Sequence, residues 1–289
     1  MIDSHMHIFD VSQIPASRKK LRYVPEKSAF LSEYLSLALP RGVTTCLVVQ
    51  PSFLGVRNKY IANSLSHGEA SPEIFGVAVV APDTSREELE ILCEKGYRGI
   101  RWNLVQEPEE VLDFSSPLFH NLWDSLNALE MHVEIHVEGF RLMRVLEQIV
   151  PRLHKVVIDH FMRPYDGCQE TKLKVPDLYR DMKRYVDLEK IWVKASGAYR
   201  VFPEMSHQMA VQYCSDLAAM LAMMLEKDRI LWGSDWPCTQ NDWKIEGESL
   251  EEKYATLRNT REIWSREGVF FDPDKAFGSL IGKVKAKCM

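Results

Sequence analysis

Eight short runs of β-branched and apolar residues recur along the whole chain, and segments with helical periodicity separate them. The runs are residues 2–9, 44–50, 74–80, 99–104, 132–137, 155–160, 191–196 and 229–235. An open doubly wound sheet is one way to arrange such strands, but no GxGxxG motif follows the first run, so its usual nucleotide fingerprint is missing. Eight strands alternating with helices therefore predict an α/β fold, a closed parallel (β/α)8 TIM barrel.

No stretch rich in Gly, Ser or Pro divides the chain, so we expect a single domain over residues 1–289. Such barrels run ~250 residues and grow by insertions, so the length fits one of them. Ser85 and Glu88 predict a capping box, and Gly96 predicts the end of the same helix. Residues 15–25, which contain Pro, Arg and Lys, are expected to form a long loop above the carboxyl ends of the strands.

The composition argues against several classes of function. Acids outnumber bases by 41 to 36 and the pI is near 6.0, which is unlike a general nucleic-acid or anionic-membrane surface. No apolar run approaches the ~20 residues of a membrane span. The residues after Met1 already have a strand pattern, so we expect no signal peptide. The six cysteines form no CxxC pair, as in proteins with reduced thiols. We expect a cytoplasmic protein without nucleic-acid or membrane partners; a homo-oligomer is compatible with the sequence.

Histidines and acids gather where the predicted strands end. The set comprises His5, His7, His136, Asp159, His160 and Asp235. His5 and His7 stand two residues apart on the first strand, so both point the same way. When a barrel closes, the last strand neighbours the first, which brings Asp235 back beside this pair. The pattern predicts a catalytic or metal-binding cluster, whereas His132, which enters its strand, is expected to be structural.

A second group of candidates is cationic or polar. Arg101, Arg163 and Arg200 follow three of the strands, with Arg141 as a weaker member. Arginine suits bidentate capture of carboxylates, so several at one mouth favour a substrate with two or more carboxylates. Further substrate-binding candidates are Tyr23, Gln50, Ser52 and His136, and Trp102 and Trp236 are candidate walls.

The ordered set of motifs resembles the amidohydrolase superfamily. The motifs are the HxH pair, "RYVPE", "VVQPSFLGVRN", "GIRWNL", "IDHFMRP", "WVKASGAYR" and "LWGSDWP", from residue 2 to about residue 240. They are similar to its amidohydrolase-related branch, which contains 2-pyrone-4,6-dicarboxylate lactonase and related lactone hydrolases. The resemblance implies an enzyme that hydrolyses a carboxylated lactone of the pyrone-dicarboxylate, muconolactone or sugar-acid type.

The resemblance also implies roles for residues. Asp235 would be the general base that activates water, and His5, His7 and His160 would orient or polarise the reacting group. Substrate contacts are implied for Tyr23, Ser52, Arg101, Arg163 and Arg200. Partial desolvation is expected to raise the pKa of a carboxylate placed among histidines and apolar walls.

The expected metal content is open to two interpretations. The fourth strand offers no lysine to be carbamylated, so a two-metal centre is not expected. One Zn²⁺ on His5, His7 and Asp235 would be a usual catalytic ligand set. The pyrone-dicarboxylate type works without metal, and the arginines can supply the positive charge. We therefore favour no obligatory metal, with a single zinc as the alternative.

Two other functions fit the same residues. A zinc-dependent decarboxylase of aromatic or unsaturated acids uses the same barrel and would need tightly bound metal. A non-catalytic binder of carboxylated metabolites is the more distant alternative, and the intact Asp235 and histidine set argue against it.

Overall fold

The computed structural model describes most of the chain, and the statements below concern those residues. They are residues 1–14, 25–66, 72–105, 113–164, 175–185, 187–201, 207–238 and 272–281. Tyr23 and nearly all of the predicted loop of residues 15–25 lie outside them.

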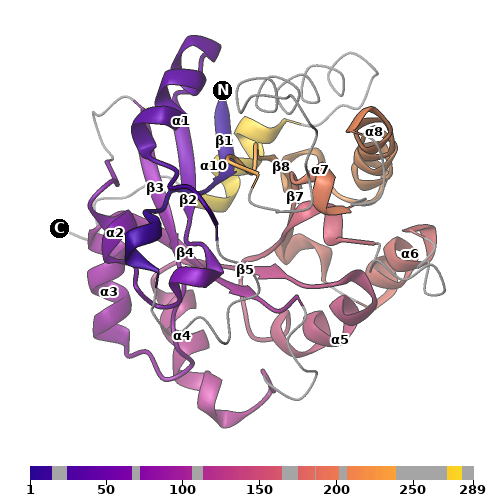
Figure 1. The fold of residues 1–289 in the computed structure, drawn as a ribbon. Helices are drawn as coiled ribbons and strands as arrows, with labels where there is room; N and C mark the ends of the chain where they lie inside the picture. Colours follow the sequence, from indigo (N-terminus) through magenta and orange to yellow (C-terminus); the bar gives the residue numbers. More distant parts are fainter. Residues whose placement is uncertain are drawn as a thin grey trace.

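Eight parallel strands follow one another around a barrel in sequence order (Figure 1). They are β1 (Ile2–Met6), β2 (Thr45–Val49), β3 (Glu73–Ala78), β4 (Tyr97–Asn103), β5 (His132–His136), β6 (Val156–Ile158), β7 (Ile191–Ala195) and β8 (Ile230–Trp232). The last strand meets the first just beyond its end, where the His7 amide donates to the Trp236 carbonyl over 2.8 Å and the Asp235 amide to the His5 carbonyl over 2.8 Å. The predicted TIM barrel is confirmed.

Helices connect the strands and surround them (Figure 1). They are α1 (Leu31–Ala38), α2 (Lys59–Ala62), α3 (Arg86–Glu94), α4 (His120–Ala128), α5 (Gly139–Ile149), α6 (Val175–Tyr185), α7 (Ala198–Val201), α8 (His207–Met224) and α10 (Pro273–Ile281). Short 3-10 turns include η4 (Ser52–Leu54) and η6 (His160–Met162). The predicted capping box of Ser85 and Glu88 opens α3. No helix among the described residues is long and apolar enough to cross a membrane.

The main core lies between the strands and the surrounding helices, because each strand turns alternate side chains outward. Trp102 packs there against Phe114 and Trp123, and Trp236 packs against Tyr34. Both tryptophans therefore take part in core packing, and their role as walls of the site stays a prediction.

The amino-terminal end of the barrel is closed by α10, drawn in yellow beside β1 and β8 in Figure 1. Phe277 and Leu280 of α10 join a buried apolar cluster with Phe75, Trp192 and Leu231 of the strands. The Trp192 indole donates to Ser279 over 3.1 Å, and the Ile2 amide donates to Asp274 over 3.2 Å. The carboxyl-terminal helix thus belongs to the barrel, and the opposite end is left for the polar groups.

Candidate active site

Asp235 is the centre of the predicted cluster. It follows β8, is fully buried, and has a φ of 54°, an uncommon value for a residue other than glycine. Its Oδ1 lies 3.2 Å from His7 Nε2 and 3.5 Å from His5 Nε2, and its Oδ2 lies 4.0 Å from His160 Nε2. The structure therefore brings together the three histidines and the carboxylate that the sequence predicts.

The charge state of Asp235 differs from the expectation. Burial acts to raise its pKa, but Arg200, His160 and His7 outweigh burial and hold the pKa well below its ordinary value of 3.8. Arg200 has the largest of these effects, because its Nε donates to Asp235 Oδ2 over 2.7 Å. The expected raised pKa is therefore wrong, since it considered desolvation and not the buried guanidinium.

Asp3 joins the two strands that carry the cluster. Its Oδ1 accepts hydrogen bonds from the backbone amides of His5 over 3.1 Å and Ser234 over 2.9 Å, and its Oδ2 accepts from the Tyr34 hydroxyl over 2.9 Å. Burial raises the pKa of Asp3, and these bonds act against that rise. Asp3 therefore holds the end of β8 in register with β1 and places Asp235 opposite the histidine pair.

Hydrogen bonds at Nδ1 fix the orientation of the imidazole rings of His7 and His160. His7 Nδ1 donates to the Val49 carbonyl over 2.7 Å, because a carbonyl can only accept. Its Nε2 then faces Asp235 Oδ1 at 3.2 Å. His160 Nδ1 lies 2.9 Å from the Ser196 hydroxyl, which can donate or accept.

A left-handed turn delivers two of the predicted residues. The φ values are 51°, 54°, 68° and 40° for His160, Phe161, Met162 and Arg163. Such a conformation costs about 1–2 kcal/mol per non-glycine residue, so the surroundings must hold it. The Gly139 amide donates to the Arg163 carbonyl over 2.8 Å, and the Arg163 amide donates back to His160 over 2.9 Å. The turn brings an imidazole and a guanidinium from one short segment into the same cluster.

Arg101, Arg163 and Arg200 each contact the buried histidines and acids at the carboxyl ends of the strands. Arg101 Nε donates to Asp159 over 2.7 Å, and its Nη2 donates to His136 Nδ1 over 3.1 Å. Arg163 Nη1 lies 3.4 Å from His136 Nε2. Burial and these cations hold the pKa of His136 well below 6.5. The weaker candidate, Arg141, donates instead to the Leu104 carbonyl over 3.0 Å and contacts Glu138.

The polar candidates after β2 take different positions. Gln50 is fully buried and donates from Nε2 to the Gly55 carbonyl over 3.0 Å, so it holds the η4 turn. Ser52 is exposed and accepts from Asn103 over 3.4 Å, which places it at the rim. Tyr23 lies outside the described residues, so its predicted contact stays a prediction.

A charged group inside the barrel escaped the sequence reasoning. Lys194 on β7 donates to Glu134 of β5, and Glu134 also contacts His132 over 3.1 Å; all three are fully buried. Burial acts to raise the pKa of Glu134, but Lys194 and His132 lower it to about 2. The signal was available, because His132 and Glu134 share a face with His136 on alternate positions of one strand.

The residues fit a metal ion only in part. Among the described residues, two donor groups lie close enough to be considered, His5–His7–Asp235 and His5–Asp159–His160. His7 could offer its Nε2, but His5 Nδ1 faces Lys194 Nζ at 3.1 Å, and an ammonium can only donate. The proton of His5 therefore belongs on Nε2, the atom that would have to bind the metal. Because a catalytic zinc usually takes three protein ligands, the group of His5, His7 and Asp235 does not fit one as it stands.

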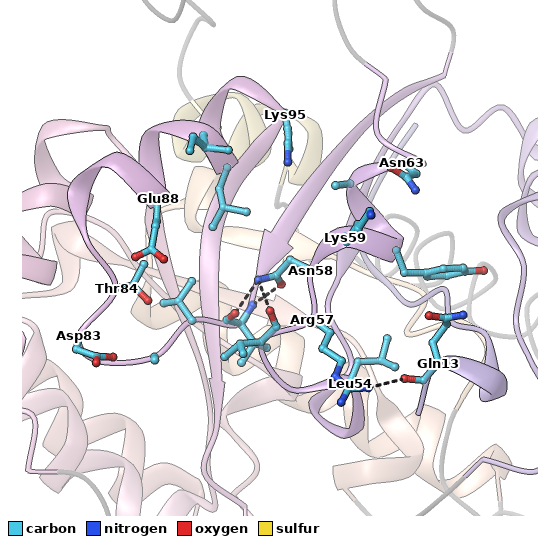
Figure 2. A pocket seen from close by; sticks show the side chains of 18 residues that line it. Gln13, Leu54, Arg57, Asn58, Lys59, Asn63, Asp83, Thr84, Glu88 and Lys95 are labelled. Atoms are coloured by element: carbon cyan, nitrogen blue, oxygen red, sulfur yellow. Dashed lines mark hydrogen bonds between the residues drawn. The ribbon is translucent and has the colours of Figure 1, made fainter. Parts of the chain in front are cut away.

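A cavity of about 1000 Å³ lies elsewhere on the molecule (Figure 2). It lies between the η4 turn and the helices α2 and α3, with Arg57, Asn58 and Lys95 among its lining. Its lining includes none of the histidines and neither Asp159 nor Asp235. The candidate chemistry therefore lies in the barrel and not in this cavity.

Comparisons with known proteins agree with the geometry. The 4-sulfomuconolactone hydrolase of Hydrogenophaga intermedia is 26% identical over 242 residues, which cover 81% of this chain and 74% of the relative. The 2-pyrone-4,6-dicarboxylate hydrolase of Comamonas testosteroni is 26% identical over 244 residues, with 82% and 76% covered. A crystal structure from Pseudomonas putida, assigned as a 2-pyrone-4,6-dicarboxylic acid hydrolase, superposes with a TM-score of 0.78 at 25% identity over 98% of each chain.

The family model described as Amidohydrolase matches residues 2–273. This range includes the HxH pair of β1, the His160 turn, Asp235 after β8 and the start of α10. Since the match covers nearly the whole chain, the protein belongs to the amidohydrolase family.

Proposed function

We propose that this protein hydrolyses a lactone that carries carboxylates, with Asp235 as the base that activates water. The observation that carries the proposal is one buried carboxylate contacted by His5, His7 and Arg200. The named relatives act on a sulfomuconolactone and a pyrone dicarboxylate, both anionic ring esters. The guanidinium groups of Arg101, Arg163 and Arg200 suit the carboxylates of such substrates.

In the proposed reaction, the water oxygen attacks the lactone carbonyl carbon while Asp235 takes the water proton. The carbonyl oxygen becomes an oxyanion, and the bond from the carbonyl carbon to the ring oxygen then breaks. Asp235 returns its proton to the departing ring oxygen, so the ring opens to a hydroxy acid or its keto form. One hydrogen-bond donor to such an oxyanion typically contributes ~3–4 kcal/mol, and the imidazoles and arginines are the available donors.

The low pKa of Asp235 has a consequence for this role. The carboxylate stays ionised at neutral pH, but it is a weak base while Arg200 holds it. A substrate carboxylate bound by Arg200 would neutralise part of this positive charge. The basicity of Asp235 would then rise when substrate binds, which couples capture of the anion to activation of water.

Arg101 and Arg163 are the proposed carboxylate clamp. Asp159 holds Arg101 through Nε, which orients the guanidinium and leaves other N–H groups of the fork for a ligand. Arg163→Met should raise KM for anionic lactones by about ten- to a hundredfold, because charged hydrogen bonds are lost. Neutral lactones should be affected far less; an equal loss for both would contradict the clamp.

No obligatory metal is part of the proposal. Positive charge comes from Arg101, Arg163 and Arg200, and the tautomer of His5 opposes zinc on His5, His7 and Asp235. We further propose a single domain over residues 1–289 in the cytoplasm, in keeping with Cys46 and Cys214, which are free thiols in the part of the chain that the structure describes.

A lactone panel tests the function directly. Purified protein is mixed with pyrone-dicarboxylate, muconolactone and aldonolactone substrates, and acid release is followed with a pH indicator, with and without a chelator. We expect rapid opening of at least one carboxylated lactone that the chelator leaves unchanged. Release of CO₂ from an aromatic acid, dependent on zinc and without lactone opening, would favour the decarboxylase instead.

A further inference from the structure

Lys194 lies beneath the histidine cluster, buried between β5 and β1. Its Nζ donates to Glu134 Oε1 and, over 3.1 Å, to His5 Nδ1. An amine buried against a carboxylate is held as an ammonium ion, which has three donors and no acceptor. The His5 nitrogen that faces it must therefore present a lone pair.

We propose that Lys194 fixes the tautomer of His5, so that His5 carries its proton on Nε2 and acts as a hydrogen-bond donor instead of a metal ligand. This Nε2 has no hydrogen-bond partner among the described residues and lies 3.5 Å from Asp235 Oδ1. An N–H at this place can donate to Asp235 or to an oxygen of a bound molecule. That the bound molecule is a reacting lactone rests on the proposed function, whereas the tautomer itself does not.

The two histidines of the HxH pair have opposite neighbours. His7 Nδ1 faces the Val49 carbonyl, an acceptor, and so must carry a proton. His5 Nδ1 faces an ammonium, a donor, and so must not. The same two-residue motif thus places one proton at Nδ1 and the other at Nε2, although both side chains point into the barrel.

A competing acceptor lies near His5 Nδ1 but is less well placed. Asp159 Oδ1 is 3.5 Å away, farther than Lys194 Nζ, and among the described residues it has no hydrogen-bond partner, because Arg101 donates to the other oxygen, Oδ2. Because Lys194 donates to Nδ1, the proton of the His5 ring belongs on Nε2. Without Lys194, that proton could move to Nδ1 and donate to Asp159, which would expose the Nε2 lone pair.

Zinc titration tests whether Lys194 keeps His5 Nε2 from binding a metal ion. Lys194→Met combined with Glu134→Gln removes both charges of the pair, so neither is left buried alone. Asp274→Asn, at the other end of the barrel, is the control, because it leaves the Lys194–Glu134 pair and the contact of Lys194 with His5 in place. The full-length chains are stripped with a chelator and titrated with zinc chloride by calorimetry.

We expect the double variant to bind one zinc ion about ten- to a hundredfold more tightly than the wild type or the control, as when one charged hydrogen bond is gained or lost. Wild-type protein that binds one equivalent as tightly as the double variant would overturn the proposal.

A second measurement uses the unmodified protein and covers the case in which the double variant does not fold. Nitrogen-15 histidine spectra report which ring nitrogen carries the proton, and His5 is assigned by its absence in His5→Gln. We expect His5 to be protonated on Nε2 alone, and a proton on Nδ1 would overturn the proposal. Neither readout uses turnover, so failure here is distinct from failure of the lactonase proposal.

Discussion

The two ends of this barrel are built on opposite principles. At the amino-terminal end, Phe75, Trp192 and Leu231 pack against Phe277 of α10 in a dry apolar layer. Toward the other end, the same strands carry buried acids, imidazoles and cations, among them Lys194, which contacts His5, and Asp235, which contacts Arg200. One end supplies stability through packing, and the other uses that stability to hold charges out of water.

The comparison shows why the polar end depends on the apolar one. Burying a charge is favourable only if its partners are held in good geometry. The left-handed turn of residues 160–163 and the φ of 54° at Asp235 add backbone strain at the same end. Substitutions at the carboxyl-terminal end of the barrel should therefore lower activity more than stability. Substitutions at the amino-terminal end of the barrel should lower stability more than activity.

Asp235→Asn should give the largest effect. We expect turnover of a carboxylated lactone to fall by about 10²–10⁴-fold, the usual contribution of a general base, while the circular dichroism spectrum is retained. The matched change at the other end is Asp274→Asn, which alters a carboxylate that accepts from the Ile2 amide, far from the proposed base. Near-normal turnover by Asp235→Asn would remove Asp235 as the base.

Phe277→Ala should separate stability from activity. Removing this buried ring leaves a cavity in the apolar layer, and we expect a loss of about 3–5 kcal/mol in the free energy of unfolding. The urea midpoint measures the loss, and kcat at a temperature where the variant is folded should stay near the wild-type value. A large fall in kcat for folded protein would mean that the two ends are coupled.

Gly197→Ala should disturb the polar end without removing any of its functional groups. A Cβ at this residue would lie 2.6 Å from His160 Nδ1, and the φ of 59° disfavours alanine there. We expect kcat to fall by about 10²-fold, as for a displacement near 1 Å. Gly278→Ala in α10 is the control, because its Cβ meets nothing within 4 Å. Equal kcat values for the two variants would contradict the placement of His160 in the reaction.

The smallest of the predicted effects concerns pH. The free energy of unfolding should decrease gradually as the pH is lowered. Burial, with neighbouring cations, lowers the pKa of His5, His132, His136 and His160 below 6.5. The unfolded chain therefore binds protons that the folded chain does not, so this stability is complete above pH 6.5 and is lost as the pH falls. The pKa of Glu134, lowered from 4.5 to about 2, adds a further loss between those values.

Urea midpoints at pH 8, 7, 6 and 5 measure this decline. Burial raises the pKa of Asp3 and Asp159, which acts in the opposite direction at low pH. The exposed His154 gives the control, because His154→Gln removes a histidine and leaves the four buried ones in place. A midpoint that rises from pH 8 to pH 6 would show that the buried histidines become charged in the folded state.

Much of the site could be predicted from the sequence because it depends on strand order and alternation. The position of His5 and His7 two residues apart, and of Asp235 after the last strand, follows from a closed barrel. The arginines could be placed at the mouth for the same reason. Their partners could not, because Arg200 meets Asp235 and Arg101 meets Asp159 only across the barrel.

The sequence by itself determined the fold, the meeting of the first and last strands, and the residue types at the mouth, because these depend on periodicity and chain order. Only the tertiary structure decided the protonation pattern. Lys194 lies 189 residues from His5 in the chain, yet the 3.1 Å contact between them sets which imidazole nitrogen carries a proton. Electrostatic and hydrogen-bond effects act over a few ångströms in space, and no local pattern in the sequence carries that distance.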